Sequence, residues 1–171
     1  MKLIVGCDGR DTAAYFTALE RTIALRDADV LLVHVVDTAF EEAWRDMAGH
    51  HWLGRRPGGR EESRFQAASA LSAPAILQEA ASLGSGWPVS LLRPIELHGN
   101  PERELVRLAL QERADVIAVG QHRVELGPHA IGRCARFVLD HAPCPVLLVR
   151  DEAIRDVATD LLGNRLGTPR T

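Results

Sequence analysis

The chain is short of several residue types, and each shortage argues against a class of protein. Its 171 residues include three cysteines, an odd number without CxxC spacing, which favours reduced, buried thiols over a disulfide framework. No apolar run approaches the roughly 20 residues that span a bilayer. The net charge is only −3, which does not fit the basic surface of a nucleic-acid-binding protein. We therefore expect a globular cytoplasmic protein that binds neither membranes nor nucleic acid.

Sequence motifs of catalysis are missing as well. The chain has no G-x-S-x-G nucleophile elbow, no GxxxxGK(S/T) phosphate loop and no G-x-G-x-x-G dinucleotide fingerprint. Its scattered histidines lack the converging spacing that metal ligands need. The sequence thus predicts a protein that is not an enzyme and that holds no metal ion.

Strand-like and helix-like segments alternate along the chain. Apolar or alternating runs typical of strands occur at residues 2–8, 30–36, 89–97, 116–119 and 145–149. Segments whose apolar residues have helical spacing lie between them. This order predicts an α/β fold, with a five-stranded parallel doubly wound sheet of Rossmann-like type and helices on both faces.

Local signals indicate where some helices begin and which faces they bury. Asn100 followed by Pro101 predicts a helix start, because asparagine caps well and proline suits the first helical position. Pro74 is expected either to kink a long helix or to start a new one. From the helical spacing we expect Ala14 on the buried face of the first helix and Leu139 on the buried face of the last.

The domain organisation follows from the same pattern. Residues 1–150 are expected to form one domain, within which residues 38–64 read as an insertion or loop because strand and helix patterns stop there. Beyond residue 150, apolar spacing predicts one short helix, and the rest of segment 151–171 is expected to be a disordered tail.

Segments near both ends of the expected domain resemble those of the universal stress protein family. The match rests on IVGCDGRDTAA at residues 4–14, LLVHVVD at 31–37, HGNPERELVRLALQERADVIAVG at 98–120 and HAPCPVLLVR at 141–150. The resemblance implies an adenine nucleotide alpha hydrolase-like fold, a cytoplasmic role in stress responses and, as in some members, a bound ATP or AMP. It also implies a homodimer formed through the last strand, with residues Pro145, Val146, Leu147, Leu148 and Val149.

Residues 114–150 read as strand, glycine-bearing loop, helix and strand, and residues 120–133 within them resemble the family's phosphate-binding loop in altered form. Nucleotide-binding members have Gly, two residues, Gly, nine residues, Gly and then Ser or Thr. Gly120 and Gly132 match the outer glycines in a loop one residue shorter than this pattern, but Arg123 and Arg133 stand at the middle glycine and the hydroxyl position. An arginine in place of the middle glycine resists close backbone approach to a phosphate. At the hydroxyl position it either blocks the pocket or grips an anion through its guanidinium group.

The resemblance also implies a set of nucleotide-binding residues. These are Asp8, the main chain of Val36, Gly120, Gln121, Gly127, Gly132 and Arg133. Asp8 has an alternative role as a cap of the turn after the first strand. Three functions stay open: a stress-response signalling module with weak or altered adenine-nucleotide binding, a dimeric interaction protein without nucleotide, and a slow ATPase.

Overall fold

The computed structural model describes residues 1–9, 12–38, 72–121 and 131–150. Its elements, in chain order, are β1 (Lys2–Gly6), α1 (Thr12–Thr22), β2 (Asp29–Asp37), α4 (Ala73–Gly84), β3 (Leu91–Gly99), α5 (Pro101–Glu112), β4 (Val116–Gly120), α6 (Arg133–His141) and β5 (Val146–Val149). All strand pairs are parallel, and the sheet order is β3-β2-β1-β4-β5. The predicted five-stranded parallel α/β fold is confirmed, and each predicted strand overlaps an observed one.

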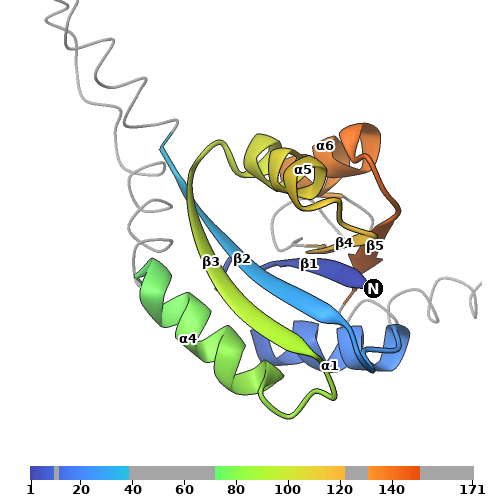
Figure 1. The fold of residues 1–171 in the computed structure, drawn as a ribbon. Helices are drawn as coiled ribbons and strands as arrows, with labels where there is room; N and C mark the ends of the chain where they lie inside the picture. Colours follow the sequence, from blue (N-terminus) through green and yellow to red (C-terminus); the bar gives the residue numbers. More distant parts are fainter. Residues whose placement is uncertain (10–11, 39–71, 122–130, 151–171) are drawn as a thin grey trace, which may run out of the picture.

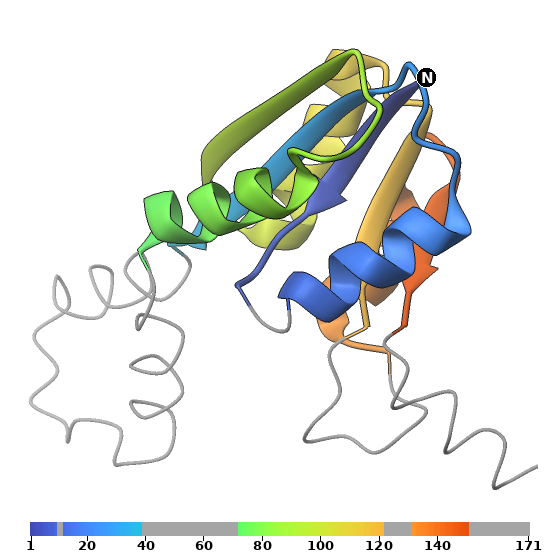
Figure 2. The same cartoon turned by 90° about the horizontal axis from the view of Figure 1, so that it is seen from below.

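The sheet is covered by helices on both faces, which divides the core into two layers (Figures 1 and 2). Alternate residues of the central strands supply each layer: Val5 and Leu32 pack toward α1 and α4, whereas Ile4 and Val33 pack toward α5 and α6. These four side chains are at most 1% exposed, as expected for parallel strands buried on both faces. No helix in the described ranges is long and apolar enough to cross a membrane.

Two of the local signals are confirmed as helix starts. The side chain of Asn100 accepts a hydrogen bond of 3.2 Å from the backbone N of Arg103, and Pro101 is the first residue of α5. Helix α4 begins at Ala73 with Pro74 in its first turn, so this proline starts a helix. In both cases the proline occupies a position whose N–H would have no intrahelical partner.

The expected buried faces of two helices need correction. In α1 the side chain of Ala14 is exposed, and Phe16 is buried instead. Its ring stacks on Trp87 with the centroids 4.8 Å apart, so α1 is turned to bury the larger aromatic surface. In α6 the prediction for Leu139 is wrong, because it is 41% exposed while Val138 is fully buried. A nine-residue helix beside the four-residue edge strand β5 buries only a narrow stripe.

Candidate functional site

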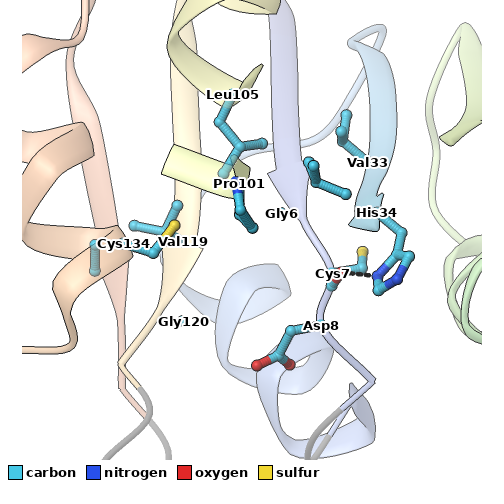
Figure 3. Close-up of a pocket in the computed structure, with 12 residues that line it drawn as sticks. Gly6, Cys7, Asp8, Val33, His34, Pro101, Leu105, Val119, Gly120 and Cys134 are labelled. Atoms are coloured by element: carbon cyan, nitrogen blue, oxygen red, sulfur yellow. Dashed lines mark hydrogen bonds between the residues drawn. The ribbon is translucent and has the colours of Figure 1, made fainter. Parts of the chain in front are cut away.

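A cavity of about 230 Å³ opens at the carboxyl ends of β1 and β4 (Figure 3). It lies where the sheet order reverses, since β1 continues to β2 on one side and meets β4 on the other. This switch point is where open α/β sheets bind ligands. The cavity is lined by Gly6, Cys7, Asp8, Val33, His34, Val35, Pro101, Leu105, Val119, Gly120, Cys134 and Ala135.

The end of β1 supplies one wall and the rim. Asp8 is exposed, and its carboxylate points from β1 toward the side of Gly120 (Figure 3). The next residue, Gly9, has a φ of 79°, and a Cβ there would lie 2.9 Å from two side-chain atoms of Ile76. Only glycine allows the chain to leave the sheet at this angle and so present Asp8 at the rim.

The end of β2 supplies the second wall. The backbone N of Cys7 donates to the carbonyl O of Val33 at 2.7 Å, and the carbonyl O of Cys7 lies 2.7 Å from Nδ1 of His34. Val35 lines the cavity, but Val36 does not. Successive side chains of a strand point to opposite faces of the sheet, so it is the side chain of Val35 that reaches the cavity.

Helices α5 and α6 pack on the same face of the sheet and supply the rest of the cavity lining. Pro101, the first residue of α5, and Cys134, the second residue of α6, both line it. Gly132 is the residue before α6, at its N-cap position. The amino ends of both helices therefore border the cavity, and their backbone N–H groups carry partial positive charge.

Arg133 pairs with a nearly buried carboxylate. Its Nε lies 3.4 Å from Oε2 of Glu102, and the side chains are 77% and 12% exposed, respectively. Glu102 belongs to the first turn of α5, where the helix dipole favours negative charge. This ion pair thus joins the first turns of α5 and α6, next to Pro101 and Cys134 of the cavity lining.

The two thiols of the cavity are protonated at neutral pH. Burial raises the pKa of Cys7 to about 12, and the negative charge of Asp8 adds to this. Burial also raises the pKa of Cys134 to about 11, with Glu102 as the next cause. Since the thiolate is the nucleophile, neither cysteine is activated for covalent chemistry.

Of the remaining predicted residues that the structure describes, Gln121 is not part of this lining. Gln121 directly follows β4 and is buried, and its backbone N donates to Val149 O at 2.9 Å. Gly127 and Arg123 lie outside the described residues. His34 was not predicted, although a single polar residue in the apolar run 30–36 was a signal for it.

Comparisons with known proteins agree on one family. A model of the universal stress protein family matches residues 1–150. A universal stress protein of Methanothermobacter thermautotrophicus is 28% identical over 139 residues, which cover 77% of this chain and 85% of that protein.

Solved structures share the fold at lower identity. The universal stress protein UspA from Lactobacillus plantarum is 20% identical with a TM-score of 0.60, over 88% of this chain and 97% of that one. A universal stress protein family member from Arabidopsis thaliana, solved with AMP bound, is 17% identical with a TM-score of 0.56, over 90% and 93%.

Proposed function

We propose that this chain, which belongs to the universal stress protein family, binds an adenine mononucleotide in the cavity between β1 and β4. The observation that carries the proposal is the position of this cavity at the switch point of the sheet, bordered by the amino ends of two helices. The Arabidopsis relative, solved with AMP bound, supports the ligand class. We propose binding without turnover, as part of a stress response in the cytoplasm.

The base is assigned to the main chain of Val35 rather than Val36. Residues of β2 alternate in the direction of their N–H and C=O groups, and Val33 faces β1 through its bond to Cys7 N. Val35 therefore faces the same way, beyond the point where β1 ends at Gly6. One N–H and one C=O on a strand edge complement the N1 acceptor and N6 donor of adenine.

The phosphate is assigned to the region of Gly120 and Arg133, with an altered contact. Arg133 stands where family members with the nucleotide-binding loop pattern have a Ser or Thr hydroxyl. The carboxylate of Glu102 already pairs with its guanidinium. A phosphate must compete with that carboxylate, and the charge of Asp8 at the rim adds repulsion. These charges oppose a triphosphate more than a monophosphate, so we propose that AMP binds more tightly than ATP.

A cavity-filling substitution tests this proposal. A Cβ on Gly6 would lie 3.6 Å from Cδ1 of Leu105, an ordinary contact, so Gly6→Val leaves the strand intact while its methyl groups occupy the cavity. Calorimetric titration with AMP should show binding by the native chain and an affinity at least about tenfold lower in the variant, or roughly 1.4 kcal/mol.

The matched control is Gly86→Val, because a Cβ at Gly86 meets nothing within 4 Å. This variant should bind AMP like the native chain. Absence of AMP binding by the native chain at millimolar ligand contradicts the proposed function, and equal binding by Gly6→Val contradicts its location. Phosphate release from ATP above the buffer rate would contradict binding without turnover.

A second candidate function, homodimerisation through the last strand, is favoured by the edge position of β5 (Val146–Val149). Its first three residues are only partly buried although all are apolar. The carbonyls of Pro145 and Val149 accept hydrogen bonds from the β4 side, so the N–H groups of Val146 and Leu148 face the edge of the described sheet, away from β4. An apolar strand edge of this kind invites pairing with a second copy across a two-fold axis.

Sedimentation of the native chain and Val146→Pro tests the dimer. Proline removes one outward N–H without touching the ladder to β4, and the first strand position tolerates it. We expect the native chain to sediment as a dimer and the variant to shift toward monomer. A native chain that stays monomeric at tens of micromolar contradicts this second function.

A further inference from the structure

The hydrogen-bond ladder between β1 and β2 ends at one identifiable atom, the backbone N of Cys7. Odd-numbered residues of β2 face β1: the N of Asp29 donates to Met1 O at 2.8 Å, and Val33 O accepts from Cys7 N at 2.7 Å. One more step of this parallel ladder would join the N–H of Val35 to the C=O of Cys7.

That carbonyl has a different partner. The O of Cys7 lies 2.7 Å from Nδ1 of His34, the interaction drawn as a dashed line in Figure 3. A carbonyl only accepts hydrogen bonds, so Nδ1 carries the proton and donates it. The partner of Cys7 O thus comes from a side chain of β2, one residue before the main-chain group that the ladder would use.

We propose that His34 is a positioning residue of the nucleotide site. Its bond turns the carbonyl of Cys7 toward the imidazole ring and out of line with the β1–β2 ladder. Within the described residues no backbone hydrogen bond joins that carbonyl to the N–H of Val35, so this N–H remains available to the base. The same bond fixes the peptide between Cys7 and Asp8, and with it the direction in which Asp8 reaches the rim. This inference rests on the proposed adenine-nucleotide binding, but it assigns a role to a side chain that acts through the main chain of its neighbours.

Two amide substitutions separate this role from a general effect on folding. Asn carries its N–H donor on a δ atom, like Nδ1 of histidine, whereas Gln carries the same amide one methylene further out. His34→Asn is therefore expected to keep the bond to Cys7 O. His34→Gln is expected to lose this bond, although its side chain carries the same polar group as that of Asn. His34→Leu removes the donor altogether. Thermal unfolding of all three verifies that they are folded before binding is compared.

The first measurement compares AMP with inosine monophosphate, which presents a donor at N1 and an acceptor at O6 in place of the adenine pattern. The native chain and His34→Asn should prefer AMP to the same extent. In His34→Gln and His34→Leu we expect the AMP affinity to fall by about tenfold, while the inosine monophosphate affinity changes by less than about twofold. An AMP preference that is equal in all four proteins overturns the inference, although the proposed function then stands.

The second measurement needs no ligand and follows hydrogen exchange at the Val35 amide. If His34 keeps the ladder open, this amide should exchange about tenfold more slowly in His34→Gln and His34→Leu, where Cys7 O is released to turn toward it and accept its hydrogen bond. In His34→Asn the rate should match that of the native chain. Unchanged exchange in all variants overturns the inference, even in the case that the native chain binds no AMP and the proposed function fails.

Discussion

Replacing Gly9 with alanine should destabilise the protein by an amount that the local geometry sets. Gly9 has a φ of 79°, and an L-residue in this left-handed region costs roughly 1–2 kcal/mol. The added Cβ would lie 2.9 Å from Cδ1 and Cγ1 of Ile76, whose side chain is only 2% exposed and has little room to move. Overpacking of this kind adds about 1–3 kcal/mol. We therefore expect Gly9→Ala to lower the free energy of unfolding by about 2–5 kcal/mol, a large part of the total for a domain of this size.

Urea unfolding at equilibrium measures this loss, with Gly86→Ala as the control. No atom lies within 4 Å of a Cβ at Gly86, so the control should change stability by no more than about 0.5 kcal/mol. A double-mutant cycle with Ile76→Val, which removes Cδ1, separates the clash from the backbone strain. The free energy of unfolding lost in the double variant should be smaller, by about 1 kcal/mol, than the sum of the losses in the two single variants. A loss below about 1 kcal/mol for Gly9→Ala refutes the reasoning, because both terms are then absent.

Two further predictions concern titrating groups. The raised pKa of Cys134, about 11, makes alkylation by iodoacetamide slow at pH 7, and Glu102→Gln should accelerate it because the Glu102 charge is the next cause of the shift after burial. An unchanged rate would show that the charge of Glu102 does not reach the thiol. The pKa of Glu112 is held below its usual 4.5, mainly by the hydrogen bond that the side chain of Lys2 donates to its carboxylate. This pair therefore adds stability above about pH 4.5 that is lost as the pH falls through the lowered pKa, and Glu112→Gln should flatten that part of the stability profile measured by urea unfolding. A profile identical to that of the native chain would contradict the assignment.

The proposed altered specificity arises from where the basic and acidic groups meet. The sequence left two roles open for Arg133, blocking the pocket or gripping an anion. The contact with Glu102 favours a third arrangement, in which the guanidinium is already engaged and a ligand phosphate must share it. Sequence spacing did not indicate this pair, because Glu102 has the ordinary appearance of an acidic residue in the first turn of a helix.

Local signals were sufficient for much of the fold. The start of α5 at Pro101 and the role of Pro74 at the start of α4 follow from capping and from the missing proline N–H, which involve only neighbouring residues. The buried faces of α1 and α6 were harder, because the core partners of Phe16 and Val138 belong to other segments of the chain. The stack of Phe16 on Trp87 is one such contact that periodicity alone does not reveal.

By itself, the sequence determined the class of the protein: the order of strands and helices, the parallel sheet, and the family. Periodicity, caps and glycines are properties of short segments, so they can be recognised in the sequence without knowledge of the tertiary contacts. Only the tertiary structure decided which groups meet at the cavity. The bond between His34 and Cys7 joins residues 27 positions apart, and the place of Val35 in the cavity lining depends on where β1 ends beside β2. Both depend on the register of neighbouring strands, which is set by packing across the whole sheet.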